Sequence, residues 1–222
     1  MSSDMVMTRR ESVIETLLET FKGIEFPGDQ FLQGSFEGCE PYDEIAAFKG
    51  KKDWRALDSA MLDAHYSALS FFSEAAFRFF FPAYLIADLR GELRTADPLF
   101  HLTGGFSVTS IDAPAGSPVT TLNTGGSTLL NPRRYGAIIS ADYARYRLSV
   151  FTREEARAIV AYLEYKREND DHGINAPRID AALNAFWLDR AANGPAQMDL
   201  RAHLRAESEF IAHLRRKSEN KT

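Results

Sequence analysis

The sequence predicts a mainly α-helical fold of the α+β type, built around one buried helix at about residues 74–90. Three observations predict it. Apolar residues recur at helical spacing along most of the chain, and the stretch Phe79–Ala87 is apolar on every side. By contrast, Thr103 to Ser140 is rich in Gly, Pro, Ser and Thr with short β-branched pieces, so we expect a small irregular β-containing excursion at about 103–151.

Length and composition indicate a globular protein. The chain has 222 residues, of which 45% are hydrophobic and 26% charged, which is enough to build a substantial core. Its formal net charge of −5 argues against a general nucleic-acid binder, which needs a basic surface. We expect one mostly helical domain over residues 1–173, with the excursion at 103–140, followed by a helical appendage at 174–222.

Cysteine usage and the first residues indicate a cytoplasmic protein. Cys39 is the single cysteine, so an intrachain disulfide and a cysteine-rich zinc site are excluded. The segment 1–13 lacks the basic start and apolar run of a secretory signal. We therefore expect a cytoplasmic location, and no motif in the chain indicates a metal or a cofactor.

The first three helices are predicted from capping and spacing. Thr8 and Glu11 form a capping box, so a helix should begin there and end near Gly23. Pro41 suits the first turn of a short helix that reaches Phe48. Apolar residues from 54 to 62 recur at helical spacing and predict a third helix from Trp54 to about residue 65.

The central helix has a good start and a proline in its interior. Ser73 is a suitable N-cap, and a helix that is apolar all round must be enclosed by protein. Pro82 should kink this helix, the alternative being a break into two. The apolar run Phe79–Ala87 is far shorter than the roughly 20 residues of a membrane span, so we predict no membrane span.

The segment after residue 103 is predicted to hold two to four short strands, among them 108–111 and 137–139. Alternation of apolar and polar residues from Tyr146 to Val150 predicts one more strand. Thr152 and Glu155 then form a second capping box, which should open a helix that ends within 169–173.

Two further helices are predicted near the carboxyl terminus. Ile179 to Trp187 marks the first, and the stretch AANGPAQ interrupts it. The second has an apolar stripe of four residues flanked by arginines: Leu200, Leu204, Ile211 and Leu214. An amphipathic stripe must be covered, so we expect a protein partner or self-association through residues 198–216, with docking on the same chain as the alternative.

Two segments also resemble a bacterial family whose activity is not established. Trp54, the stretch ALSFFSEAAFRFFFPAYLIADL and the later RLSVFTREEARAIVAYLEY carry the resemblance, which covers about 10–102 and 145–168. Members of the family have Pro-Glu where this chain has Glu74-Ala75, and Tyr-Tyr-Leu where it has Phe79–Phe81. The resemblance implies the helical fold and supplies no mechanism.

Candidate site residues lie mostly on or beside the central helix. They are His65, Glu74, Arg78, Asp88 and His101. Glu74 and Arg78 are four residues apart and could pair on one helix face, whereas Asp63 and His65 would point apart on a helix. Catalytic motifs such as His-Glu-x-x-His or Gly-x-Ser-x-Gly do not occur. Two hypotheses remain: a non-catalytic protein-binding module, and a hydrolase-like enzyme with a cleft beside the central helix.

Overall fold

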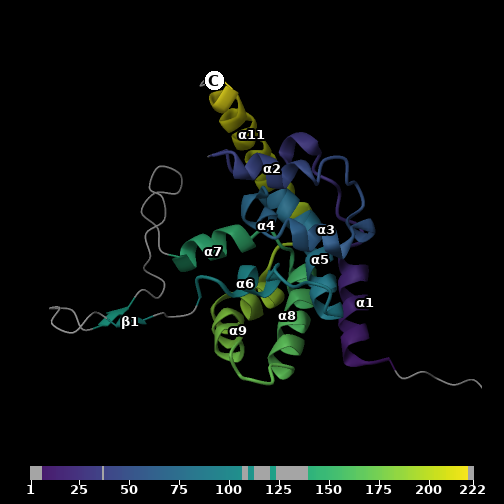
Figure 1. Cartoon of the computed structure of the whole chain (residues 1–222), viewed down its shortest axis with the longest axis vertical. Coiled ribbons are helices and arrows are strands. Elements are labelled where there is room, and N and C mark those ends of the chain that lie inside the picture. Colours follow the sequence, from purple (N-terminus) through teal and green to yellow (C-terminus); the bar gives the residue numbers. More distant parts are fainter. Residues whose placement is uncertain (1–6, 37, 107–109, 113–120, 124–139, 220–222) are drawn as a thin grey trace, which may run out of the picture.

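The computed structural model describes residues 7–36, 38–106, 110–112, 121–123 and 140–219, and these residues are mainly helical (Figure 1). This confirms the predicted fold class. Helix α5 (Glu74–Arg90) lies in the middle of the molecule, and α1 (Arg9–Phe21), α8 (Arg153–Glu168) and shorter helices surround it (Figure 1).

Helix α5 has the bounds that the sequence predicts. Its N-cap is Ser73, whose hydroxyl accepts a hydrogen bond from the amide of Ala76 at 3.0 Å. The helix continues through Pro82 without a break, so the alternative of two separate helices is wrong. It ends at Gly91, whose φ of 73° is a left-handed conformation that glycine adopts without strain.

The two predicted capping boxes are both confirmed, and both open helices that pack against each other. Thr8 and Glu11 cap α1, and Thr152 and Glu155 cap α8. The stripes of α1 and α8 are fully buried at several positions, among them Leu17, Phe21, Ile159 and Leu163. Helix α1 also packs against α5, and α8 reaches α5 through side-chain contacts such as that of Tyr162 with Asp88.

Short elements also surround α5. They are a 3₁₀ turn (Asp29–Phe31), α2 (Glu40–Ala46), a second 3₁₀ turn (Trp54–Ala56), α3 (Ser59–Ala64), α4 (Ala68–Phe71) and α6 (Pro98–Thr103). One predicted boundary is wrong, because Trp54 belongs to the 3₁₀ turn and not to α3. The Asp53 carboxylate caps that turn and Leu57 is extended, which separates the two elements.

Two strands are described in the excursion. β1 (Ser110–Asp112) pairs antiparallel with β2 (Thr121–Asn123), and Ile111 lies opposite Leu122. The predicted strand at 108–111 thus overlaps β1. The predicted strand at 137–139 lies outside the described residues.

The predicted strand at 146–150 is wrong. Residues up to 148 belong to α7 (Ser140–Leu148), and Val150 lies in the turn that follows. Ala144 and Leu148, four residues apart, are both buried. Residues at that spacing lie on one face of a helix. The alternation covers only five residues, which is too short to distinguish a strand from the end of a helix.

The last helices follow the predicted order. α9 (Ala176–Ala182), a π-helical segment (Leu183–Trp187) and α10 (Leu188–Asn193) run on without interruption, and Gly194 ends them. The indole of Trp187 is fully buried and donates to the carbonyl of Leu102 at 2.9 Å. These helices thus add side chains to the same core; a separate appendage at 174–222 stays a prediction.

Helix α11 (Leu200–Glu219) follows a 3₁₀ turn (Gln197–Asp199) and extends to the carboxyl-terminal tip of the molecule (Figure 1). Leu200 and Ile211 of its apolar stripe are buried against the rest of the chain. The stripe is therefore covered at these positions by the chain itself, and self-association through 198–216 stays a prediction.

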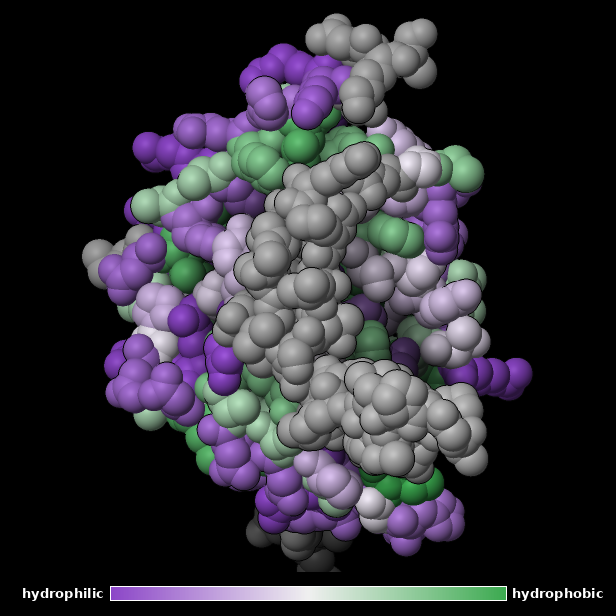
Figure 2. Space-filling model, turned by 90° about the vertical axis from the view of Figure 1, so that its left-hand side faces the viewer, coloured by the Kyte–Doolittle hydropathy of each residue, from purple (hydrophilic) through white to green (hydrophobic). Residues whose placement is uncertain are grey.

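The described surface on one face of the molecule is mostly hydrophilic, with smaller hydrophobic areas. On the face shown in Figure 2, hydrophilic residues occupy much of the described surface, with hydrophobic residues in smaller groups between them. Within the part of the chain that the structure describes, we find no helix with the length and apolar character of a membrane span.

The first prediction concerns Phe81, which is fully buried in the middle of α5. Replacing Phe81 with alanine should lower the free energy of unfolding by about 3–5 kcal/mol, because burial is lost and a cavity remains. Denaturant unfolding measures the change. Phe100→Ala is the matched control, since Phe100 is 56% exposed, and it should have an effect below about 0.5 kcal/mol. Equal effects of the two substitutions would contradict the placement of Phe81.

Candidate functional site

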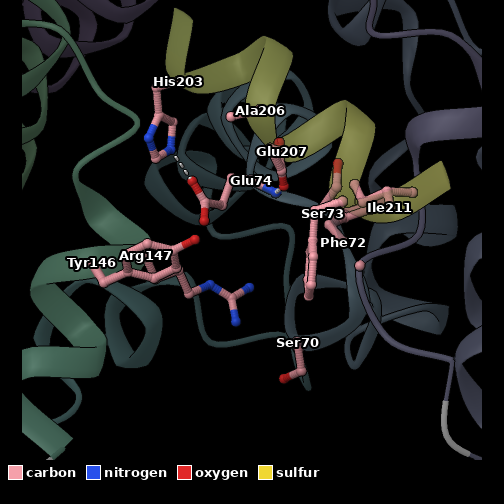
Figure 3. Close-up of a pocket in the computed structure, with 12 residues that line it drawn as sticks. Ser70, Phe72, Ser73, Glu74, Tyr146, Arg147, His203, Ala206, Glu207 and Ile211 are labelled. Carbon is pink, nitrogen blue, oxygen red and sulfur yellow. Dashed lines mark hydrogen bonds and ion pairs between the residues drawn. The ribbon is translucent and has the colours of Figure 1, made fainter. Parts of the chain in front are cut away.

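A pocket of about 250 Å³ lies at the amino-terminal end of α5 (Figure 3). Its walls come from segments that are far apart in the sequence: Gly34, the α4–α5 junction, the end of α7, and α11. The charged residues that line it are Glu74, Arg147, His203 and Glu207. Figure 3 shows these side chains directed toward a common space between α7 and α11.

Glu207 of α11 caps the central helix from outside. Its carboxylate accepts hydrogen bonds from the backbone N–H groups of Glu74 and Ala75, the second at 3.0 Å. The first amides of a helix have no partner within the helix, and they carry the positive end of its dipole. Glu207 and Ser73 together satisfy three of these amides, so this contact fixes α11 over the end of α5.

Glu74 and His203 form the second link between α5 and α11. The Nε2 atom of His203 lies 2.5 Å from a carboxylate oxygen of Glu74. Burial and the negative charge of Glu74 raise the pKa of Glu207 to about 7, although hydrogen bonds from two amides and the charge of His203 act in the opposite direction. Near neutral pH, Glu207 is therefore protonated in part of the molecules.

Arg147 brings a positive charge to the pocket from the end of α7. Its Nη2 atom donates to the carbonyl of Leu69, and its guanidinium carbon lies 4.6 Å from the ring centroid of Phe77. No carboxylate lies within ion-pair distance of it among the described residues. A carbonyl and a ring face thus hold Arg147, and neither cancels its charge.

Aromatic side chains form the mouth of the pocket. Tyr146 is 53% exposed and Phe210 is 52% exposed, and both line the cavity. Phe72 and Ile211, which also line it, are buried. The pocket therefore has a polar interior, an apolar wall and a mouth that offers ring surface to a bound molecule.

Arg78, a residue predicted from the sequence, lies outside the pocket. It is 2% exposed, and its guanidinium binds the carboxylate of Glu155 through two hydrogen bonds of 2.5 and 2.9 Å. A third bond goes to the side chain of Gln197. The expected pair of Glu74 and Arg78 is wrong, because the fold brings each residue a stronger partner from a distant helix.

His65 and Asp63 contact other parts of the fold and do not line the pocket. His65 is the C-cap of α3, and its Nδ1 atom lies 3.5 Å from the carboxylate of Glu44. Asp63 accepts hydrogen bonds from the amides of three successive residues, 94–96, which lowers its pKa. The two side chains thus serve different neighbours, in agreement with their predicted divergence.

Asp88 and His101 also lie away from the pocket. Asp88 accepts a hydrogen bond of 2.6 Å from the hydroxyl of Tyr162 and pairs with Lys166, so it joins α5 to α8. The ring of His101 lies near that of Phe77, and burial together with the charge of Arg147 lowers its pKa to about 3. His101 is therefore neutral at physiological pH.

Of the five residues predicted from the sequence, only Glu74 lines the pocket. Arg147, His203 and Glu207 also line it, and none of them was among the residues predicted from the sequence. His203 and Glu207 are four residues apart beside the stripe of α11, so their common helix face was visible in the sequence. Nothing local in the sequence connects that face with Glu74, which is more than a hundred residues away.

Comparisons with known proteins add no assignment. No protein-family model, no curated protein and no solved structure matches the chain. The resemblance to a bacterial family therefore stays a prediction. Within the described residues, we find no group of three or more His, Cys, Asp or Glu side chains placed to hold a metal ion.

The second prediction concerns the buried pair of Arg78 and Glu155. Arg78→Ala leaves the carboxylate of Glu155 buried without its cation, which should lower the free energy of unfolding by about 3–5 kcal/mol. Replacing both residues with apolar ones should recover only part of this loss, because no carboxylate is left buried without Arg78 but the cap that Glu155 provides for α8 is lost. Arg90→Ala, at an exposed position of the same helix, is the control. Denaturant unfolding decides, and a single variant as stable as the control would refute the role of the pair.

The third prediction concerns pH. Because the folded state raises the pKa of Glu207 from 4.5 to about 7, it binds more protons than the unfolded state between these values. The ionisation of this carboxyl group therefore lowers the free energy of unfolding as pH rises from about 4.5 to about 7. The destabilisation is absent below this range and complete above it.

The free energy of unfolding of Glu207→Gln, relative to that of the wild type, should increase progressively between pH 5 and pH 8. Urea unfolding at several pH values measures this difference. Glu209→Gln, at an exposed position two residues away, should change little over the same range. A constant difference between the wild type and Glu207→Gln would show that Glu207 does not titrate in this window.

Proposed function

We propose that the chain is a non-catalytic binding module and that the pocket at the amino-terminal end of α5 is its binding site. One observation carries this proposal: charged side chains from α5, α7 and α11 converge on a cavity whose mouth exposes Tyr146 and Phe210. Pockets that combine an apolar wall with a few convergent polar groups are the usual form of binding sites.

The size of the pocket indicates what it accepts. A cavity of about 250 Å³ lies just below the range of roughly 300–1,000 Å³ that is typical of drug-sized ligands. The bound group is therefore about the size of one or two amino-acid residues. It is either a small molecule or a residue that a peptide partner inserts, and the latter agrees with the protein partner expected from the sequence.

A hydrolase-like enzyme is the second candidate, and one observation favours it. The pKa of Glu207 is raised to about 7, which suits general acid–base catalysis at neutral pH. Two contacts favour binding instead. Both carboxylate oxygens of Glu207 already accept helix amides, and the hydroxyl of Ser73, which lines the pocket, donates to the carbonyl of Phe31. Hydrolysis of chromogenic esters, amides or phosphoesters that is abolished by Glu207→Gln would favour the enzyme.

The fourth prediction tests the pocket by filling it. Ala206 lines the cavity and is exposed on α11, so Ala206→Trp should occupy the space where a ligand would lie. Ala202→Trp is the matched control, because Ala202 is exposed one turn earlier on the same helix and does not line the pocket. Thermal unfolding is measured with a panel of amino acids, dipeptides, amines, organic acids and sugars.

A true ligand should raise the melting temperature of the wild type and of Ala202→Trp, since it binds only the folded chain. It should leave Ala206→Trp unchanged. Compounds that act equally on all three proteins would place binding elsewhere, and a panel without any effect would remove the support for a residue-sized ligand.

A further inference from the structure

The pocket has two ends of opposite charge. Glu74 and Glu207 lie at the start of α5, and Arg147 enters from the end of α7 (Figure 3). The side-chain charges that shift the pKa of Glu207 are those of Glu74 and His203, whereas Arg147 acts on His101. Both ends line one cavity, and no ion pair between Arg147 and either carboxylate is found among the described residues.

Among the described residues, His203 is the one basic side chain that lines the acidic end beside its two carboxylates. The charge of the Glu74 carboxylate acts on the Glu207 carboxyl group there, and the imidazole of His203 is already paired with Glu74. The hydrogen bonds that the structure shows for the Glu207 side chain come from backbone amides, at a half-buried position. A positively charged group of a ligand placed here would be attracted by both carboxylates.

At the basic end, we find no carboxylate within ion-pair distance of Arg147 among the residues that the structure describes. A guanidinium group has five N–H donors, and the hydrogen bond that the structure shows for Arg147 goes to the carbonyl of Leu69. The ring of Phe77 covers one face of this group. A carboxylate could therefore accept hydrogen bonds from the remaining donors, in the geometry that arginine favours.

Apolar residues lie between and beside these two ends. Phe72 and Ile211 form a buried part of the wall, and Phe210 lies at the exposed mouth of the pocket. An apolar side chain of a ligand would be covered by them. The complement of this pocket is thus a short molecule with a cation, an anion and an apolar branch.

We propose that the pocket binds a small zwitterion, a free amino acid or a dipeptide with an apolar side chain. Its ammonium group lies at Glu74 and Glu207, its carboxylate at Arg147, and its side chain against Phe72, Phe210 and Ile211. This inference rests on the proposed function and specifies the ligand of the same site.

The test blocks one charge at a time. Binding of leucine and of glycyl-leucine to the full chain is measured by calorimetry, beside N-acetyl-leucine and leucinamide and the correspondingly blocked forms of the dipeptide. Acetylation removes the ammonium charge and amidation removes the carboxylate. We expect each blocked form to bind at least about tenfold more weakly than its parent, since each loses a charge-assisted contact.

Proton release gives a second measurement. A bound ammonium group should lower the pKa of Glu207, so binding at pH 7 should release protons, which appears as a dependence of the binding heat on the buffer. Glu207→Gln should abolish this release, and Glu209→Gln should retain it. Arg147→Gln should weaken leucine binding while leucinamide binding stays unchanged; Arg201→Gln, at an exposed position on α11, is its control.

The outcomes are distinct. If leucinamide or N-acetyl-leucine binds as tightly as leucine, the proposal of a zwitterionic ligand is wrong, because the pocket does not recognise the charge that is missing. If no zwitterion binds but another compound of the panel is excluded by Ala206→Trp, this inference fails and the binding module stands. If Ala206→Trp excludes no compound, both fail. Should Arg147→Gln not fold, the blocked ligands on the wild-type chain still decide.

Discussion

The structure depends on the burial of one helix that is apolar on every side. A helix with an apolar stripe needs one neighbour, but α5 has buried residues all around its axis and needs several. The chain meets this need with α1, with α8 and with the shorter helices. Phe77, Phe80 and Phe81 are fully buried as a result, and aromatic rings of the core contact one another in edge-to-face, tilted or stacked arrangements.

Enclosing α5 creates a second constraint at its ends. The amides of its first turn and the charges near it are removed from bulk water, so other elements must satisfy them. Glu155 provides a carboxylate for Arg78, and Glu207 provides one for the amides of Glu74 and Ala75. Both carboxylates come from helices far along the sequence. The polar contacts of α5 therefore help to hold α8 and α11 in place, together with apolar packing.

The candidate pocket is a consequence of this arrangement. Where α11 crosses the start of α5, two carboxylates approach each other, and α7 contributes Arg147 from the other side. The charges of this site are only partly compensated, and in our proposal a bound molecule of complementary charge compensates them. The buried pair of Arg78 and Glu155 is the opposite case, because the two charges are paired with each other and buried.

The sequence by itself determined the elements whose causes are local. Two capping boxes, the N-cap Ser73 and the apolar run of α5 were correctly predicted, because each depends on residues within three or four positions. The false strand at 146–150 shows the limit of such patterns when they are short. Tertiary structure alone decided the partners of charged residues: Glu74 and Arg78 are suitably spaced to pair, yet each pairs with a residue more than 70 positions away. A buried charge takes the partner that the packing of helices brings to it, and no local pattern records that packing.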